Sequence, residues 1–334
     1  MGTDGPTFHL VVNPSAGHGR AAKLLPRVRE RLEAVPGAEV VVHSSTSYAH
    51  AEELCRTSAA RARRGREGRG RDALVVMGGD GMAHLGLNAC ADARAEGLDV
   101  PLGVVPAGTD NDFCRGVGLA TESFSAVEAI VAGHTRRIDL SEVTGQLRDG
   151  AEHRFVGSVV STGYDARVNL ATNTFPHPIG PLGSLAYGAI ALAELARFAP
   201  LDYRLWIDGQ TREISSVLVA VANAGHFGGG MKVLPDARVD DGLLDVVLVG
   251  SLTRRDVLRL LPKLYRGSHV HEDVVEVIRA REVRIDGASV ARDGSRGTMF
   301  AMADGELLGD VPITITCRPG LLDVFASVGS VPSR

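Results

Sequence analysis

The chain has 334 residues, 44% of them hydrophobic and 23% charged, so it is long enough for two globular domains with separate cores. Its formal net charge of −4 gives no overall attraction to nucleic acid, and we expect no nucleic-acid partner. The four cysteines are far apart and form no CxxC pair, which argues against a zinc knuckle or a disulfide framework and favours a reducing cytoplasm.

The sequence predicts no segment that crosses a membrane. Residues 1–12 lack the basic start and the long apolar core of an export signal. The most apolar longer stretch, 182–200, contains Glu194 and Arg197 and is expected to form a buried helix. We therefore expect a cytoplasmic protein that contacts a membrane only peripherally, at its inner face.

The first 134 residues alternate short apolar runs with helical patterns. This alternation predicts βαβ units and an α/β domain with a mainly parallel sheet. Strands are expected at Phe8–Val12, Glu39–His43, Ala73–Met77 and Leu102–Val105, and helices at about Gly19–Glu33, Ala49–Arg64, Ala83–Glu96 and Ser123–Ala132.

After residues 134–140 the pattern changes, because strand candidates follow one another with turns between them. They are Phe155–Ser161, Tyr203–Asp208, Ser216–Ala222, Leu244–Val249, Val283–Ile285, Met299–Ala303 and Ile313–Cys317. Helical patterns interrupt them at 182–198 and 254–265. We therefore expect a β-rich second domain, antiparallel and sandwich-like.

Three glycine-rich loops follow three of the predicted strands of the first domain. Residues 13–20 (NPSAGHGR) follow the first strand, 78–82 (GGDGM) the third and 106–113 (PAGTDNDF) the fourth. Glycines let backbone N–H groups approach an oxyanion, and the N-terminus of a following helix adds a favourable dipole. An ordinary turn, or an Asx-turn in the last loop, is the alternative interpretation of each loop taken alone.

The carboxyl ends of neighbouring parallel strands meet at one edge of a sheet, so the three loops are expected to converge on one crevice. None of them continues into the Gly-Lys-Ser/Thr of a P-loop, and none has the spacing of a dinucleotide fingerprint. In the second loop, Asp80 could hold a magnesium ion or orient a donor. The sequence thus predicts a nucleotide site of another kind.

Together, the three loops resemble the diacylglycerol kinase catalytic family, which also holds the sphingosine kinases and the bacterial soluble lipid kinases. The resemblance covers nearly the whole chain, and in the second domain it is carried by 161–166 (STGYDA), 228–232 (GGGMK), 235–237 (PDA), 240–245 (DDGLLD) and 304–306 (DGE). It implies an ATP-binding α/β domain at 1–134, to which a C-terminal segment at about 320–334 returns. It also implies a larger β-rich lipid-substrate domain at 135–319.

The resemblance further implies the residues that bind ATP and metal. The candidate nucleotide-binding residues are Asn13, Pro14, Ser15, Ala16, Gly17, Ser45, Gly78, Gly79, Asp80, Gly81, Met82, Ala83, His84, Leu85, Gly108, Thr109, Asn111 and Asp112. By the same matching, Asp241 and the backbone carbonyls of Arg238 and Leu243 are expected to hold a structural Mg²⁺, an ion that takes oxygen ligands.

The catalytic base of the family belongs to the DGE segment, here Asp304 and Glu306, and Asp80 completes the expected catalytic set. A lipid hydroxyl that attacks the γ-phosphoryl group needs a carboxylate to accept its proton. Without the resemblance, Asp304 and Gly305 predict a hairpin turn. The implied activity is phosphorylation of diacylglycerol by ATP and Mg²⁺ to give phosphatidic acid, and which of the two carboxylates takes the proton stays open.

The chain departs from the family pattern at several site positions. Met82 stands where threonine is usual, and His84 and Leu85 stand where asparagine and glutamate are usual. Because Met82 has no hydroxyl for a phosphate, backbone N–H groups or Thr109 would have to replace that contact. We interpret these departures as variation within the family rather than as loss of activity.

Several alternatives remain open at this point. A sphingoid base or another long-chain alcohol offers the same kind of hydroxyl as diacylglycerol. An NAD kinase also has a GGDG loop, but it does not need the segments 106–113 and 240–246. A non-catalytic nucleotide- or lipid-binding regulator would fit Met82, although it would have little reason to keep the carboxylates of 80, 304 and 306.

The lipid acceptor is expected in an apolar pocket of the second domain, around Phe175–Tyr187 and Phe227. The sequence does not reveal the shape of that pocket. A homodimer is implied only by the family. Closure between the two domains is a further hypothesis, since phosphoryl transfer needs water to be excluded.

Overall fold

The structure, a computed structural model, describes residues 5–62, 71–148, 150–163, 200–290, 296–297, 299–304 and 306–327. Several sequence predictions lie outside these residues, namely the helix at 182–198, the acceptor pocket around 175–187, the segment 164–166 and Gly305. Among the described helices, none is both long and apolar enough to cross a bilayer.

The N-terminal part is an α/β unit whose strands run parallel. β1 (Thr7–Val12), β2 (Glu39–Ser44), β3 (Ala73–Gly78) and β4 (Leu102–Pro106) lie in the order β4-β3-β1-β2. The helices of this part are α1 (Ala16–Glu33), α2 (Tyr48–Arg61), α3 (Asp80–Ala95), the short α4 (Asp112–Gly116) and α5 (Ser123–Ala132). The sequence prediction for this part is confirmed, except that α4 was not foreseen and the ends shift by a few residues.

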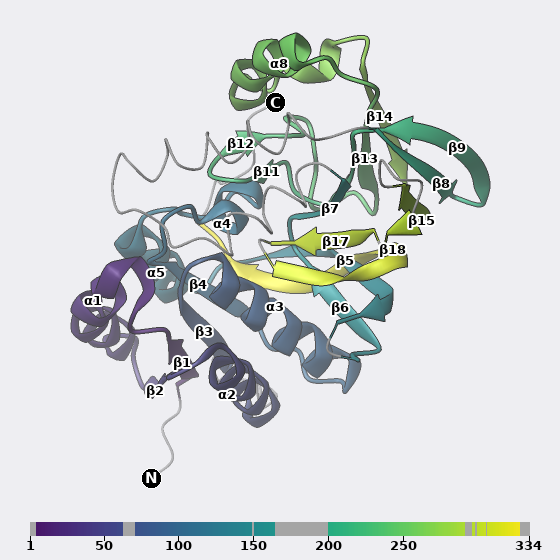
Figure 1. Cartoon of the computed structure of the whole chain (residues 1–334). Helices are drawn as coiled ribbons and strands as arrows, with labels where there is room; N and C mark the ends of the chain where they lie inside the picture. Colours follow the sequence, from purple (N-terminus) through teal and green to yellow (C-terminus); the bar gives the residue numbers. More distant parts are fainter. Residues whose placement is uncertain are drawn as a thin grey trace.

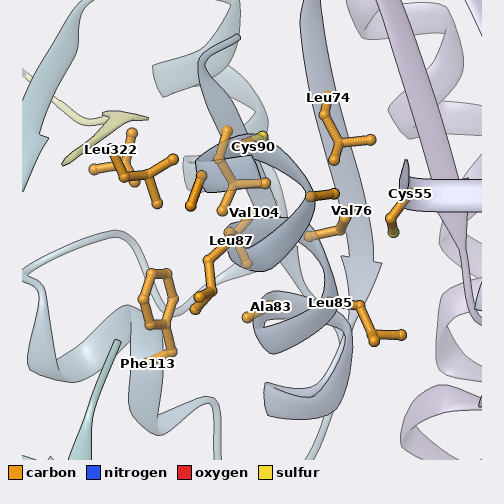
Figure 2. Packing of buried hydrophobic residues seen from close by; sticks show 14 of the residues in the cluster. Cys55, Leu74, Val76, Ala83, Leu85, Leu87, Cys90, Val104, Phe113 and Leu322 are labelled. Atoms are coloured by element: carbon orange, nitrogen blue, oxygen red, sulfur yellow. The ribbon is translucent and has the colours of Figure 1, made fainter. Parts of the chain in front are cut away.

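Helices cover both faces of the parallel sheet, which explains why its strands are apolar without alternation. Along β3, Leu74 and Val76 share a core with residues of α2 and α3, whereas Val75 and Met77 share a core with residues of α1 and α5. Figure 2 shows the first of these cores around Leu87. Burying one such side chain contributes about 1.5–3 kcal/mol to the stability of the fold. The buried sheet therefore holds the loops at its edge in defined positions.

The C-terminal part is a β-rich antiparallel unit. Its strands are β5 (Thr135–Leu147), β6 (His153–Val156), β7 (Val159–Gly163), β8 (Leu201–Ile207), β9 (Gln210–Ser216), β10 (Leu218–Ala222), β11 (His226–Phe227), β12 (Met231–Lys232), β13 (Leu244–Val249), β14 (Val275–Ala280), β15 (Glu282–Val290), β16 (Arg296–Gly297), β17 (Phe300–Ala303) and β18 (Glu306–Phe325). The helix α8 (Arg254–Arg266) and the 3₁₀ turn η1 (Ser268–His271) follow β13. The predicted α/β plus antiparallel β-rich fold is therefore confirmed.

Both faces of the central antiparallel strands are buried, as in a sandwich. On β10, Val219 and Val221 share a core with Leu205 and Ile285, whose strands β8 and β15 branch from the main sheet. Ala220, on the opposite face of β10, packs in a second core near β12 and α8. Figure 1 shows α8 at the end of the molecule remote from α1 and α2.

The long strand β18 joins the two parts of the molecule. Its first residues pair with β17, and most of its length pairs with β5. Near its end, Val324 pairs in parallel with Leu102 of β4. Figure 1 shows β18, in yellow, running from β17 toward β4. The turn between β17 and β18 is therefore positioned relative to the loops of the parallel sheet by continuous strand pairing.

The strand predicted at Phe155–Ser161 is wrong as a single element. The chain leaves the extended path at Gly157 and Ser158, between β6 and β7. At this break the backbone N–H of Asn223 donates to the carbonyl of Ser158 at 2.9 Å, and a Cβ at Gly157 would lie 2.4 Å from the ring of Phe113. Tertiary contacts, which an apolar pattern does not report, thus divide the run into two strands.

Several strands were not predicted, among them β5, β9 and β14, whose apolar pattern is interrupted by charged residues. Among the described strands, β9 pairs with β8 alone and β14 with β13 alone. Polar side chains on such edge strands remain in water. The sequence signal of an edge strand is therefore weak.

Candidate active site

The three glycine-rich loops lie together at the carboxyl edge of the parallel sheet, because β1, β3 and β4 are adjacent. The N–H of Asn13, after β1, donates to the carbonyl of Met77 at the end of β3 at 3.0 Å. The N–H groups of Ala107 and Gly108, after β4, both donate to the carbonyl of Gly78, at 2.7 and 3.1 Å. The expected convergence of the loops is therefore present.

Close backbone contacts between the loops require glycine at particular positions. Gly17 has a φ of +58°, and a Cβ there would lie 2.2 Å from the carbonyl oxygen of Ala107. A Cβ on Gly108 would lie 2.5 Å from the Cα of Gly79. Both obstacles are backbone atoms that cannot rotate away, so these glycines bring the loops into direct contact.

In the first loop, the polar side chains stabilise the loop itself. The Oδ1 atom of Asn13 accepts hydrogen bonds from the N–H and the hydroxyl of Ser15, at 3.1 and 2.7 Å. The hydroxyl of the buried Ser45 donates to the carbonyl of Val12 at 3.1 Å. Residues 17–19 all have left-handed backbone angles, so the regular part of α1 begins only after them. The sequence predicts that these residues contact ATP. Since their side chains are engaged within the loop, we expect those contacts to come mainly from backbone groups.

The second loop forms the N-terminus of α3. Met82, Ala83 and Leu85 are buried in the core of the α/β part, and the Met82 side chain packs beneath Gly78. The methionine that replaces the usual threonine thus points away from the loop surface. Among the described residues, the N–H groups of Asp80 and Gly81 have no hydrogen-bond partner. Such N–H groups at the positive end of a helix dipole are suited to bind phosphate oxygens.

Two carboxylates, the half-buried Asp80 and the buried Asp112, connect the loops to each other and to the β-rich part. Asp80 accepts a hydrogen bond from the N–H of Phe113 at 2.9 Å, which links the second loop to the third. Asp112 accepts hydrogen bonds from the N–H groups of Gly229 and Gly230, at 2.7 and 2.8 Å. Burial raises the pKa of Asp80 above its usual value, even though backbone N–H groups that donate to it lower the pKa. The third loop is therefore held from both sides.

The remaining polar residues of the third loop differ in exposure. Thr109 is exposed at the loop surface. Asn111 has a φ of +53°, and its amide donates to the carbonyl of Gly108 at 3.2 Å. The Asn111 Oδ1 atom is buried without a hydrogen-bond partner among the described residues. Thr109 is thus the one of these two side chains that is free to reach a ligand.

The DGE segment forms a tight turn and also lies at the site. Ala303 pairs with Glu306 across the β17–β18 hairpin, and Asp304 adopts a φ of +49° in the turn. The Oδ2 atom of Asp304 lies 3.0 Å from Nδ1 of His84 on α3, and both side chains are buried. The hairpin prediction and the active-site prediction are therefore both compatible with the observed turn.

Glu306 lies beside the start of α3. Its Oε1 atom would be 3.9 Å from a Cβ at Gly81, and the ring of Tyr48 on α2 would be 3.6 Å from the same Cβ. Glu306 is exposed by surface area, but partial desolvation of its carboxylate is the main cause that raises its pKa; His84 opposes this rise and the neighbouring Asp304 adds to it. Tyr48 is 47% exposed, yet partial desolvation of its hydroxyl and the charge of Glu306 likewise raise its pKa.

A cavity of about 630 Å³ opens beside Glu306. It lies between α2, α3, β6 and the start of β18, and its walls include Tyr48, Glu52, His84, Arg154 and Glu306. The walls mix paired charges with small apolar groups. Motif reasoning did not point to Tyr48, since its position at the start of α2 carries no motif, and only the fold brings it to Glu306.

Both carboxylate oxygens of Asp241, a predicted Mg²⁺ ligand, already have partners in the structure. One oxygen of Asp241 accepts a hydrogen bond from the N–H of Leu243 at 3.1 Å, and the other pairs with the guanidinium of Arg279. Arg279 also lies 3.4 Å from Asp245, its cross-strand neighbour. Within the described residues, no group of three or more metal-binding side chains is found. The positive charge at this loop is supplied by an arginine, and the magnesium site with Arg238 stays a prediction.

Glycine-rich loops with N–H groups at a helix N-terminus, next to partly or fully buried carboxylates, are typical of a phosphotransferase site. Comparison with protein families agrees with this class. Residues 7–143 match the diacylglycerol kinase catalytic domain, and residues 158–326 match the YegS C-terminal NAD kinase beta sandwich-like domain. The chain belongs to the diacylglycerol kinase catalytic domain family and is an enzyme of that family, as its loops predicted.

Related proteins match the chain along almost its whole length. It is 33% identical over 319 residues to the diacylglycerol kinase of Mycobacterium tuberculosis strain H37Rv, covering 94% of this chain and 93% of that one. It is 26% identical over 302 residues to the diacylglycerol kinase of Bacillus subtilis strain 168, covering 90% and 92%. The crystal structure of a diacylglycerol kinase from Bacillus anthracis str. Sterne superposes with a TM-score of 0.69 over 97% of this chain and 98% of that one, at 19% identity. That structure supports the fold.

Proposed function

We propose that this enzyme transfers the γ-phosphoryl group of ATP to the hydroxyl of diacylglycerol and thereby forms phosphatidic acid. The family and the relatives named as diacylglycerol kinases support this proposal. One observation of the site carries it further. The β17–β18 turn brings Asp304 and Glu306 against the start of α3, where a phosphate group is best bound.

In the proposed reaction, the N–H groups of Asp80 and Gly81 receive the terminal phosphates of ATP. The Mg²⁺ that accompanies ATP neutralises part of the phosphate charge. A carboxylate of the turn, Asp304 or Glu306, accepts the proton of the lipid hydroxyl as its oxygen attacks the γ-phosphorus. The contacts of Asp304 and Asp112 across the two parts of the chain help to exclude water from the reacting groups.

The acyl chains of diacylglycerol stay in a bilayer, so the proposed reaction takes place at a membrane surface. We propose peripheral binding at the inner face of the membrane, with the glycerol hydroxyl presented to the site. The cavity beside Glu306 is wide enough to admit a polar head group.

Transfer of labelled phosphate from Mg²⁺–ATP to diacylglycerol in mixed micelles tests the proposal. The wild type would be compared with Asp304→Asn, Glu306→Gln and the control Glu128→Gln, whose carboxylate pairs with Arg31 on the surface. We expect labelled phosphatidic acid from the wild type and the control. At least one of the two site variants should lose about 100-fold or more in rate, since general base catalysis contributes about that much.

Sphingosine and NAD, offered in parallel, separate the alternative functions. Label in sphingosine but not in diacylglycerol would replace the acceptor by a sphingoid base. Label in NAD would make the protein an NAD kinase. Binding of ATP without label in any acceptor would favour a non-catalytic regulator.

A further inference from the structure

We propose that His84 is a positioning residue of this reaction. As a neutral imidazole with its proton on Nδ1, it holds the Asp304 carboxylate so that Oδ1 is left to take the acceptor proton, and Asn88 fixes that tautomer. The proposal rests on the proposed kinase function. It specifies how the Asp304 carboxylate, a candidate base of that reaction, is held in place. It concerns a histidine that stands where asparagine is usual in the family pattern.

The first observation is that Asp304 is held from two elements at once. Its backbone is fixed in the β17–β18 turn by the pairing of Ala303 with Glu306. Its Oδ2 atom lies 3.0 Å from Nδ1 of His84, which comes from the second turn of α3. The side chains of His84 and Asp304 are only 7% and 4% exposed, so water does not compete for this contact.

The second observation is that the other carboxylate oxygen has no partner. Oδ1 of Asp304 is buried and accepts no hydrogen bond from any described residue. Leaving a buried polar atom without a partner costs about 1–3 kcal/mol, more if it is charged. The oxygen is enclosed in this structure, so a hydroxyl can remove that cost only after the β17–β18 turn and α3 separate enough to expose it. The acceptor of a lipid kinase brings such a hydroxyl.

The third observation concerns the orientation of Asn88, one turn further along α3. Its Oδ1 atom accepts from the N–H of Phe155 at 2.8 Å, and its Nδ2 atom donates to the carbonyl of Phe155 at 2.9 Å. Rotating the amide by 180° would place its NH₂ group against the N–H of Phe155 and its oxygen against the carbonyl of Phe155. Both contacts would then be repulsive. The backbone of β6 therefore fixes which end of the Asn88 amide faces His84.

That orientation determines the tautomer of His84. The Nδ2 atom of Asn88 donates to the His84 carbonyl at 2.9 Å and lies 3.4 Å from the ring atom Nε2. Both N–H groups of Nδ2 are used by the carbonyls of His84 and Phe155, and the amide nitrogen has no lone pair that could accept from Nε2. A proton on Nε2 would therefore face a donor group without an acceptor, so we infer that Nε2 carries none. The single ring proton is then on Nδ1, from which it is donated to Asp304.

The tautomer decides what His84 does in the reaction. The O–H bond of the acceptor breaks as its oxygen bonds to the γ-phosphorus, and the proton moves to Oδ1 of Asp304. The bond from the γ-phosphorus to the bridging oxygen breaks, and ADP leaves with that electron pair. His84 donates the same hydrogen bond before and after this step, so it orients Asp304 and takes no proton itself.

Nuclear magnetic resonance of protein labelled with ¹⁵N-histidine tests the tautomer directly. The signals of His84 would be identified by their absence in His84→Asn. We expect a protonated Nδ1 and an unprotonated Nε2 at neutral pH. A ring that carries its proton on Nε2 alone would overturn the proposal, and this measurement on the wild type remains valid even if a variant fails to fold.

Kinetics of phosphate transfer to diacylglycerol give the second test. We expect His84→Ala to lower kcat by about 100-fold with KM for ATP and diacylglycerol changed by less than about threefold. His84→Asn, which can again donate to Asp304, should recover at least about tenfold of that loss. The control is His153→Asn, because His153 also lies 3.0 Å from a carboxylate, that of Asp92, but in an exposed pair.

The outcomes distinguish this proposal from the function on which it rests. If the wild type transfers no phosphate to any lipid, the proposed function fails, while the tautomer remains measurable. If the wild type is active and His84→Ala keeps its kcat, the positioning role is wrong. A rise in KM for ATP with unchanged kcat would likewise overturn it, because it would make His84 a part of the nucleotide site.

Discussion

Replacing Asp112 by asparagine should weaken the contact between the third loop and the β-rich part. Asp112 is 8% exposed, and its two oxygens accept hydrogen bonds from Gly229 and Gly230 at 2.7 and 2.8 Å. Asparagine keeps one acceptor but turns an N–H₂ group toward the other backbone N–H. One hydrogen bond to a charged group is lost, and a buried donor is left without a partner.

The magnitude follows from these two changes. A hydrogen bond to a charged group contributes about 1.5–3 kcal/mol, and an unsatisfied buried donor costs about 1–3 kcal/mol. Because the loop can relax in part, we expect Asp112→Asn to lower the free energy of unfolding by about 2–4 kcal/mol. The same variant should exchange the amide hydrogens of Gly229 and Gly230 faster, since they lose their acceptor.

Urea denaturation followed by circular dichroism, with hydrogen exchange of residues 228–230, measures both effects. Asp110→Asn is the matched control, because its carboxylate lies on the same loop, is exposed and has no hydrogen bond among the described residues. If Asp112→Asn differs from the wild type by less than about 0.5 kcal/mol, the buried contact does not link the two parts as we infer.

Two further perturbations follow from the same contacts. Gly108→Ala should raise KM for ATP by about tenfold or more. The added Cβ would lie 2.5 Å from the Cα of Gly79 and would separate the second loop from the third. Unchanged ATP binding by calorimetry would contradict this. Asp323→Asn should lower the free energy of unfolding by about 1–2 kcal/mol at pH 7. Burial raises the pKa of Asp323, but hydrogen bonds from Arg137 and Arg71 outweigh it and hold this pKa below the usual value. With a lowered folded-state pKa, the stabilisation is present above about pH 4 and is lost as the pH falls through the folded value, so the difference between wild type and variant in urea should vanish in strong acid.

The sequence alone predicted the parts of the fold whose signal is local. β1, β3 and β4 are buried on both faces and are therefore continuous apolar runs, and each is followed by a glycine-rich loop. Since parallel strands end at one edge, the convergence of the loops also followed from the sequence. Motif order then identified the family before any contact between distant residues was known.

Other features were decided by tertiary structure, because they depend on partners far along the chain. Edge strands such as β9 carry polar residues that predict a loop as readily as a strand. Met82 was weighed as a lost phosphate contact, whereas the fold buries its side chain beneath Gly78. A pattern of residue types does not tell which way one helical side chain points.

The pairing of His84 with Asp304 joins residues 220 positions apart, and a motif comparison treated them as two separate segments. Asn88 was not considered at all, since a lone asparagine within a helix has no distinctive spacing. The sequence determined which chemical groups the site contains, through its loops and its DGE turn. Only the packing of α3 against β6 and the β17–β18 turn determined which atoms face one another, because hydrogen bonding in a buried site depends on orientation that no local pattern encodes.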